Sequence, residues 1–336
     1  MRTSGRMPTP VRAVVLFLFG LTPAVAASDS PRTIGRIETL DPAMDRWVGG
    51  DTPIEVLASG FTWCEGPAVM PGDGDPQLLL SDIPRNTIYR WSESDGVTTY
   101  MRPSGYTGVA YYGLEPGSNG LAFDGRGRLL ACEHGDRRVS LLTPGGGKVT
   151  LADRYEGRRF NSPNDLTLAD DGTVYFTDPP YGLPDRESDP RRELDFCGVY
   201  RLSPDGSLEL LTDDIRRPNG IGLTPDGRSL IVAQSDPDEP VWYRLDLDGG
   251  AAPRVIADAR EDVRRTAGLP DGLAIAADGT IFGSGPGGVY VMDPDGSRLG
   301  IIHTGRRTSN CVLDENRHTL YITADDVVLR VALKAP

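Results

Sequence analysis

The chain consists largely of short apolar runs that alternate with polar positions and are separated by turn residues. Asp171-Gly172 precedes Val174-Tyr175-Phe176, and Asp226-Gly227 precedes Leu230-Ile231-Val232. An Asp-Gly pair between two such runs is a strong hairpin signal, because glycine accepts the positive φ that a tight turn needs. The 41 glycines and 28 prolines also favour many turns and short strands over long helices. The pattern therefore predicts an all-β protein.

One sequence unit occurs six times. Each copy opens with an acidic or amide residue, usually followed by glycine, and continues through an apolar run, a turn and further β-rich runs. The opening residues are Glu65, Asn119, Asn164, Asn219, Asp271 and Asn310. Successive copies are 54, 45, 55, 52 and 39 residues apart, a range that brackets the period of propeller blades. Four short antiparallel strands repeated six times predict a six-bladed β-propeller.

The two ends of the repeat region complement each other. The sixth copy ends near the C-terminus after its third strand, at residues 328–333, and residues 54–57 have the pattern of the missing fourth strand. We expect this N-terminal strand to complete the last blade, since such closure removes an exposed sheet edge. The propeller then occupies residues 46–336, and residues 27–45 form a polar leader ahead of it.

The first 26 residues have the three parts of a signal peptide. Arg2, Arg6 and Arg12 precede or open an apolar run at residues 13–21, and a small-residue cleavage pattern ends at Ala26. The run is shorter than the roughly 20 residues that a membrane span needs. We therefore expect export to a secreted or periplasmic location, with no membrane attachment after cleavage.

Charge and cysteine content narrow the possible partners. The formal net charge is −13, which argues against nucleic acid as a ligand, because its phosphates would be repelled. The cysteines form no C-x-x-C pair, so a structural zinc site is not expected. An exported protein can form disulfides, but four cysteines allow three pairings, and buried free thiols are the alternative. The cysteines are Cys64, Cys132, Cys197 and Cys311.

The six opening residues all carry side-chain oxygen. The first strand of each propeller blade lines the central channel, so these two carboxylates and four amides are expected to form a ring. Turn chemistry is the alternative, but these residues open a strand and do not connect two strands. Oxygen ligands suit Ca²⁺ best, Mg²⁺ and Mn²⁺ also accept them, and Zn²⁺ prefers His or Cys. A second ring is expected at the ends of the second strands, formed by Asp82, His134, Asp178 and Ser235.

The sequence lacks the motifs of three other kinds of site. No G-x-S-x-G elbow occurs for a serine hydrolase, and the glycine-rich segment 283–288 opens no helix and has no phosphate-loop lysine. A dinucleotide site needs a strand-helix unit that the pattern does not contain.

Several motifs, in order, resemble the SMP-30/gluconolactonase/LRE-like family from about residue 50 to the C-terminus, and most closely its bacterial gluconolactonase type. The motifs are Trp63-Cys64-Glu65-Gly66-Pro67, Cys132-Glu133-His134-Gly135, Asn161-Ser162-Pro163-Asn164-Asp165, Phe176-Thr177-Asp178-Pro179-Pro180-Tyr181-Gly182, Arg217-Pro218-Asn219-Gly220 and Pro270-Asp271-Gly272. The resemblance implies a six-bladed propeller with one divalent cation in its channel. It also implies that the protein is an enzyme that hydrolyses a lactone.

The resemblance also implies roles for individual residues. Glu65, Asn219 and Asp271 match the metal ligands of the family, and Asn164 matches an Asn beside the metal. Asp271 matches the residue that transfers protons. Animal members bind substrate through an Arg two residues before that Asn, but this chain has Ser162 there. The charged loop 182–194, with Arg186, Arg191 and Arg192, is a candidate replacement, and a solvated surface loop is the alternative.

These assignments lead to one functional hypothesis and two rivals. The hypothesis is metal-assisted hydrolysis of a sugar lactone, with Asp271 as the proton-transfer group and Glu65, Asn164, Asn219 and Asp271 around the cation. Asn119, His134 and Asp178 are expected to contact the substrate. The first rival is an organophosphatase or a lactonase for other rings on the same fold. The second is a non-catalytic propeller that binds a ligand.

Overall fold

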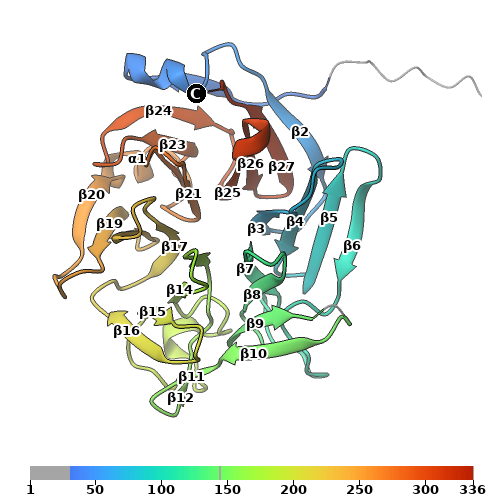
Figure 1. Cartoon of the computed structure of the whole chain (residues 1–336), viewed down its shortest axis with the longest axis vertical. Coiled ribbons are helices and arrows are strands. Elements are labelled where there is room, and N and C mark those ends of the chain that lie inside the picture. Colours follow the sequence, from blue (N-terminus) through green and yellow to red (C-terminus); the bar gives the residue numbers. More distant parts are fainter. Residues whose placement is uncertain (1–30, 144, 336) are drawn as a thin grey trace, which may run out of the picture. The chain divides into compact units, whose positions relative to one another are not determined.

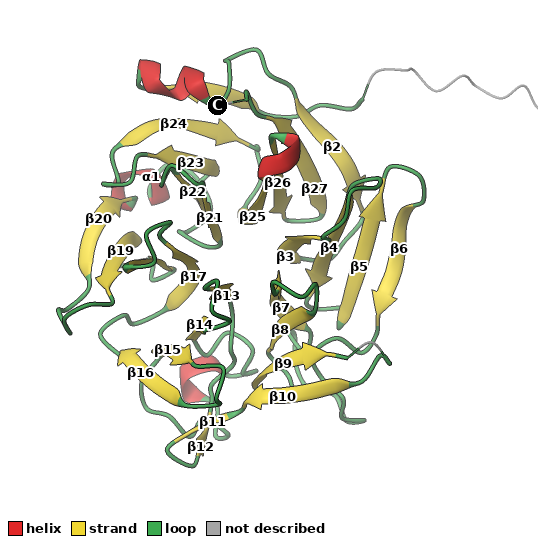
Figure 2. Ribbon diagram, viewed as in Figure 1, coloured by secondary structure: helices red, strands yellow, loops and turns green. Residues whose placement is uncertain are grey.

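The short apolar runs form strands, and these strands build six sheets around a central channel (Figure 1). The computed structural model describes residues 31–143 and 145–335, and the predicted signal peptide lies outside them. Residues 32–336 form one compact unit. Figure 2 shows strands throughout this unit, with the helices as short pieces between them. The prediction of a mainly β, six-bladed propeller is confirmed.

The first three blades follow each other along the chain, and each is a four-stranded antiparallel sheet. Blade one consists of β3 (Cys64–Val69), β4 (Gln77–Asp82), β5 (Thr87–Ser92) and β6 (Gly96–Met101). Blade two consists of β7 (Ser118–Phe123), β8 (Leu129–Glu133), β9 (Arg138–Leu142) and β10 (Lys148–Ala152). A hairpin of β11 (Arg154–Tyr155) and β12 (Arg158–Arg159) follows. Blade three consists of β13 (Leu166–Leu168), β14 (Val174–Asp178), β15 (Gly198–Leu202) and β16 (Leu208–Thr212).

The remaining blades complete the circle. Blade four consists of β17 (Pro218–Leu223), β18 (Ser229–Gln234), β19 (Val241–Asp246) and β20 (Arg254–Asp258). Blade five contains β21 (Leu273–Ile275), β22 (Ile281–Gly285), β23 (Gly288–Met292) and β24 (Arg298–His303). Blade six contains β25 (Thr308–Asp314), β26 (Thr319–Ala324) and β27 (Val327–Ala332). The helices are α1 (Arg260–Val263) and the 3-10 turns Pro42–Arg46, Arg186–Ser188 and Glu315–Arg317. No helix in the described residues is long and apolar enough to cross a membrane.

The N-terminal segment closes the propeller, as the sequence predicts. Strand β2 (Ile54–Ser59) lies antiparallel to β27, with Ile54 opposite Val331, and becomes the outer strand of blade six (Figure 1). This pairing covers the edge of β27 and ties the two ends of the domain together.

The structure adds a second N-terminal strand that the sequence pattern did not indicate. Strand β1 (Arg36–Thr39) pairs with β24 as a fifth strand of blade five, and Met44 in the following 3-10 turn is buried in the core. Residues 32–45, which the sequence analysis assigned to a leader, therefore belong to the same compact unit. A strand of four mostly polar residues at a sheet edge shows no clear alternation of apolar and polar positions. It could therefore be located only from its pairing with the edge strand β24 in the folded structure.

The hydrophobic core lies between neighbouring blades. Leu79 and Ile88 of blade one pack with Leu121 and Leu129 of blade two. The next interface contains aromatic residues: Phe176 stacks on Tyr200 with ring centroids 5.2 Å apart, and both belong to a cluster that includes β8 and β9 residues. Each sheet thus buries both faces against its neighbours, which holds the inner strands in register around the channel.

All four cysteines lie in the described part of the chain, and each is buried with a free thiol. Cys64 donates from Sγ to the Val327 carbonyl at 3.0 Å, and Cys311 donates to the Phe282 carbonyl at 3.1 Å. The disulfide pairing that the sequence left open is therefore not formed, and the thiols serve as small buried side chains.

The glycine that follows an opening residue is required by close contact between inner strands. A Cβ atom on Gly220 would lie 2.2 Å from the Asp271 carbonyl oxygen, and one on Gly66 would lie 2.0 Å from that of Asn119. Both contacts are with backbone of the next blade, which cannot move aside alone. The repeated glycine is thus explained by the close approach of neighbouring inner strands, which leaves no room for a side chain.

We expect Gly220→Ala to lower the free energy of unfolding by about 3 kcal/mol, since the new methyl group overpacks the contact with Asp271. Thermal unfolding measured by circular dichroism checks this. Gly125→Ala is the matched control, because a Cβ at Gly125 has nothing within 4 Å. Equal unfolding temperatures for the two variants would contradict the explanation.

Candidate active site in the central channel

Five of the six opening residues line one cavity at an end of the channel. The cavity has a volume of about 580 Å³. These five are Glu65, Asn119, Asn164, Asn219 and Asp271. The sixth, Asn310, lines the cavity at the other end of the inner strands and donates from Nδ2 to Asp165 Oδ2 at 3.4 Å. The structure therefore brings together the four residues predicted to hold a cation, together with Asn119.

Hydrogen bonds between blades hold these residues in a closed ring. The Ser81 hydroxyl on β4 donates to the Asn119 carbonyl at 2.8 Å, and the Thr177 hydroxyl on β14 donates to the Asn219 carbonyl at 2.7 Å. The Gly120 amide donates to the Asn164 carbonyl at 2.8 Å. Because each backbone is tied to the neighbouring blade, the side chains above it have little freedom to separate.

The two carboxyl groups of the ring are buried close to each other and to Asp165, and these groups repel one another. Burial, followed by repulsion from Asp165, raises the pKa of Glu65 to about 8. Burial, followed by repulsion from Glu65 and Asp165, raises the pKa of Asp271 well above its ordinary value. A bound divalent cation would relieve this repulsion and keep both groups ionised. The electrostatics therefore favour a cation at this position.

Two amides direct free oxygen atoms to the site. Asn164 is 2 % exposed, and its Oδ1 has no hydrogen-bond partner among the described residues. Asn219 donates from Nδ2 to Ser235 Oγ at 2.8 Å, which leaves its Oδ1 for a ligand. Within residues 31–143 and 145–335, no three His, Cys, Asp or Glu side chains are arranged to hold a metal ion. A cation here would therefore have mixed carboxylate and amide ligands, the donor set that Ca²⁺ accepts.

Asp165 is a site residue that the sequence analysis missed. Its carboxyl group is buried beside the ring, and burial raises its pKa to about 7. It stands where four of the six copies have glycine, directly after the opening residue. That substitution of a charged residue for glycine was the available signal. Its negative charge adds to those of Glu65 and Asp271 and strengthens the attraction for a cation.

Two members of the second ring, Asp82 and Asp178, hold backbone in place, whereas Ser235 lines the cavity. Both carboxylate oxygens of Asp178 accept backbone N–H groups, from Asn161 and Ser162, each at 2.8 Å. Asp82 accepts from the Thr62 amide at 3.0 Å in the equivalent place of blade one. These side chains hold the segment that leads into the first strand of their own blade. Asp178 does not line the cavity that holds the opening residues, and its predicted contact with substrate stays a prediction.

Ser162 lies at the start of the charged loop 182–194 and holds it in place. The buried Ser162 hydroxyl donates to the Pro179 carbonyl at 2.6 Å and accepts from the Gly182 amide at 2.9 Å, so it anchors the start of the loop. Of the three loop arginines, Arg186 lines the cavity. Arg191 pairs with Asp189 at 2.7 Å, and Arg192 donates to Asn161 Oδ1 at 3.2 Å.

Five further residues of the cavity wall received no role in the sequence analysis, although three of them stand in its quoted motifs. The cavity wall also contains Trp63, Glu115, Tyr181, Arg217 and Arg307. Arg307 lies over the Trp63 ring at 4.8 Å from its centroid, and Arg217 donates to Glu187 at 2.9 Å. The mouth thus combines aromatic faces with both signs of charge, which suits a polar ligand with an apolar ring face.

Comparisons with known proteins agree with this fold and site. The SMP-30/gluconolactonase/LRE-like region matches residues 60–326. A gluconolactonase of Zymomonas mobilis is 38% identical, over 98% of this chain and 94% of its own length. A pentonolactonase of Haloferax volcanii is 26% identical, over 77% of this chain and 80% of its own. The solved structure of a gluconolactonase from Xanthomonas campestris superposes with a TM-score of 0.77 at 32% identity, covering 90% of this chain and 96% of that one.

The fold alone does not define an activity, but together with these comparisons it places the chain among the lactone hydrolases. This chain belongs to the SMP-30/gluconolactonase/LRE-like family.

Proposed function

We propose that this protein is a gluconolactonase-type hydrolase that opens the ring of a sugar lactone with the help of a divalent cation. The observation that carries the proposal is the meeting of Glu65, Asn164, Asn219 and Asp271 at one cavity. The similarity to gluconolactonases over nearly the whole chain supports the same activity.

The ligand set fits one hard cation. Glu65 and Asp271 would supply two negative charges, and Asn164 and Asn219 would supply neutral oxygens, so these four ligands would balance the charge of one divalent cation. Ca²⁺ is the expected ion, with Mg²⁺, Mn²⁺ and Zn²⁺ as alternatives. When bound, the cation supplies Lewis-acid polarisation of the substrate carbonyl.

The side chains of the cavity perform the remaining steps. Asp271 takes the proton of the attacking water on its carboxylate oxygen, and later gives that proton to the ring oxygen that leaves as a hydroxyl. Glu65 supplies the second negative charge that would hold the cation. Asn164, through its unpartnered Oδ1, orients the water or a substrate hydroxyl. Because this geometry is built into the inner strands, little reorganisation is needed during the reaction.

The decisive experiment is a lactone panel assayed by pH-stat on metal-stripped protein, titrated with each of the four cations. We expect cation-dependent opening of glucono-δ-lactone. A higher rate for a phosphotriester at fixed Ca²⁺ would favour the organophosphatase rival. Absence of both activities, with no cation-dependent shift in unfolding temperature, would favour the non-catalytic rival.

The N-terminal sequence supports export, to a secreted or periplasmic location. We expect the mature protein to begin at Ala27, after removal of residues 1–26. Expression of the full chain in a bacterial host, fractionation of periplasm and medium, and mass measurement of the intact protein check this. Full-length protein retained in the cytoplasm would contradict it.

A further inference from the structure

A buried histidine lies beside two side chains of the cavity wall. His134 is 0 % exposed and does not itself line the cavity, whereas Glu115 and Asn119 do. The His134 Nε2 atom lies 3.4 Å from Asn119 Nδ2. The His134 Nδ1 atom lies 3.6 Å from Glu115 Oε2, just beyond hydrogen-bond distance, and has no other polar partner among the described residues, so Glu115 is the carboxylate that this buried nitrogen faces.

The protonation of His134 follows from its surroundings. Burial lowers the pKa of His134 to about 3, so the ring is neutral, with one donor and one acceptor nitrogen. Burial raises the pKa of Glu115 to about 7, so above that pH its carboxylate faces Nδ1. Nδ1 must then carry the proton, because two lone pairs would repel each other. Nε2 accepts from the Asn119 NH₂ group, and the Asn119 amide oxygen is left for a ligand in the cavity.

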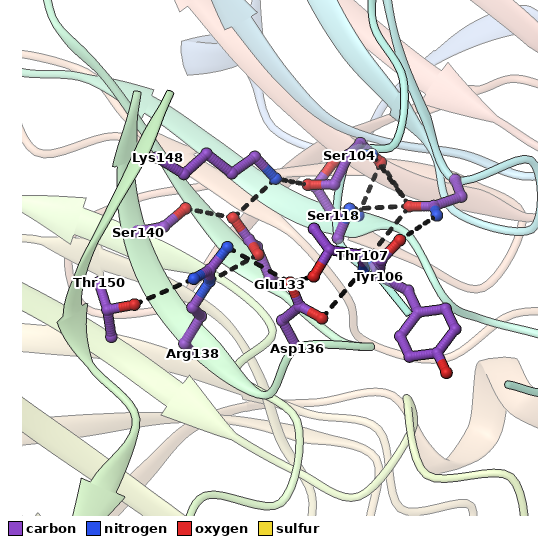
Figure 3. Close-up of polar contacts among 12 residues, drawn as sticks. Ser104, Tyr106, Thr107, Ser118, Glu133, Asp136, Arg138, Ser140, Lys148 and Thr150 are labelled. Atoms are coloured by element: carbon purple, nitrogen blue, oxygen red, sulfur yellow. Dashed lines mark hydrogen bonds and ion pairs between the residues drawn. The ribbon is translucent and has the colours of Figure 1, made fainter. Parts of the chain in front are cut away.

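The segment that carries Glu115 is firmly anchored to blade two (Figure 3). The buried Glu133 carboxylate binds Arg138 and Lys148, each at 2.8 Å, and Lys148 also donates to the Ser104 carbonyl. The Thr107 hydroxyl donates to Asp136 at 2.8 Å. These contacts hold the start of the segment between β6 and β7 against the β8–β9 turn, on the same side of blade two as His134.

The same segment also touches the histidine directly. The Tyr112 hydroxyl donates to the His134 carbonyl at 3.3 Å. A Cβ on Gly135 would lie 2.4 Å from the Tyr106 Cβ atom, so the segment packs closely over the residue that follows His134. Side chains held this closely keep one orientation, which a recognition site requires.

The polar atoms that Glu115 and Asn119 present to the cavity select for hydroxyl groups of a ligand. The Asn119 amide oxygen and the second Glu115 oxygen are both acceptors, and a sugar lactone carries hydroxyl donors around its ring. An unsubstituted lactone would leave these acceptors without partners, and a site built to bind hydroxyls rejects analogues that lack them.

We propose that Glu115, His134 and Asn119 form one recognition unit for the hydroxyl groups of the substrate, with His134 as a positioning residue that orients the other two. The inference rests on the proposed lactonase function and names its substrate class, polyhydroxylated lactones. It adds Glu115 to the substrate-contacting residues.

The test compares two lactones at pH 7.5, corrected for spontaneous hydrolysis: glucono-δ-lactone and the unsubstituted δ-valerolactone. In His134→Gln and Glu115→Gln, kcat/KM for glucono-δ-lactone should fall by about 30-fold, mainly through KM. For δ-valerolactone it should change by less than about threefold, since this ring makes none of the lost hydrogen bonds. The selectivity between the two lactones therefore collapses.

His303→Gln is the matched control, because His303 makes a similar pair with Glu38, at 2.7 Å, on the outer edge of blade five. It should leave the selectivity unchanged. If the His134→Gln variant does not fold, the Glu115→Gln variant provides the test, because Glu115 lies on the cavity surface. An unchanged ratio of the two lactones, or equal losses with both, would overturn the inference. Wild-type protein that hydrolyses neither lactone would instead overturn the proposed function.

Discussion

Asp271→Asn should lower kcat for glucono-δ-lactone by about 1,000-fold or more, even at saturating Ca²⁺. The substitution keeps the size of the side chain but removes its proton-accepting oxygen and one of the two charges that face the cation. Asp271 lies in the cavity beside Glu65, where burial and repulsion raise its pKa. Asp271→Ala should have the same effect.

The measurement needs metal binding and chemistry to be separated. The variant is washed with EDTA, Ca²⁺ is added back, and titration calorimetry gives the Ca²⁺ affinity while a pH-stat gives kcat. Glu187→Gln is a suitable control, since Glu187 is a carboxylate near the cavity mouth that binds Arg217 and lies outside the ring. Full activity of Asp271→Asn with Ca²⁺ bound would reject its proton-transfer role.

Removal of the cation should make the stability of the protein depend strongly on pH. Burial raises the folded-state pKa of Glu65 to about 8 and that of Asp165 to about 7, and raises that of Asp271 as well. In the unfolded chain these groups titrate near pH 4. The folded protein therefore holds more protons between about pH 4 and pH 8, and its stability is greatest below that window and falls as the pH rises through it.

The expected loss is on the order of 5 kcal/mol across the window, or about 10 °C in unfolding temperature. Calorimetric scans in EDTA at pH 4.5, 6 and 8 measure it, and a parallel series in excess Ca²⁺ is the control, because the bound cation keeps the carboxylates ionised. Glu65→Gln should flatten part of the dependence in EDTA. The same unfolding temperature at all three pH values in EDTA would show that these carboxylates are not close together in the folded protein.

Much of the fold could be predicted because the same sequence pattern occurs in every blade of a propeller. Each copy had its own hairpin turns and its own opening residue, so six weak local patterns supported the same blade. The closure by β2 was predictable because the sixth copy was short by one strand. Strand β1 was not predictable, since it has no repeat partner and its position depends on the free edge of β24.

The residues of the candidate site also fall into those that the repeat predicted and those that it did not. Glu65, Asn119, Asn164, Asn219 and Asp271 were found because equivalent positions of a repeat face one axis. Asn310 belongs to the same series but faces the other cavity, where it binds Asp165. Asp178 was assigned to the substrate from its position alone, yet its carboxylate caps two backbone amides. Sequence position could not reveal this, because both acceptors are satisfied by a loop of the same blade.

The sequence by itself determined the number of blades and the closure of the propeller, because these depend on periodic patterns and local turn chemistry, and its motifs indicated the family and the residues predicted to hold a cation. Only the tertiary structure decided which polar side chains reach the cavity and which stay beneath its wall. Glu115 reaches it from a loop without a repeat, and His134 lies buried behind it. The reason is physical: a buried polar group must find a partner, and that partner comes from whichever segment the folded chain places beside it.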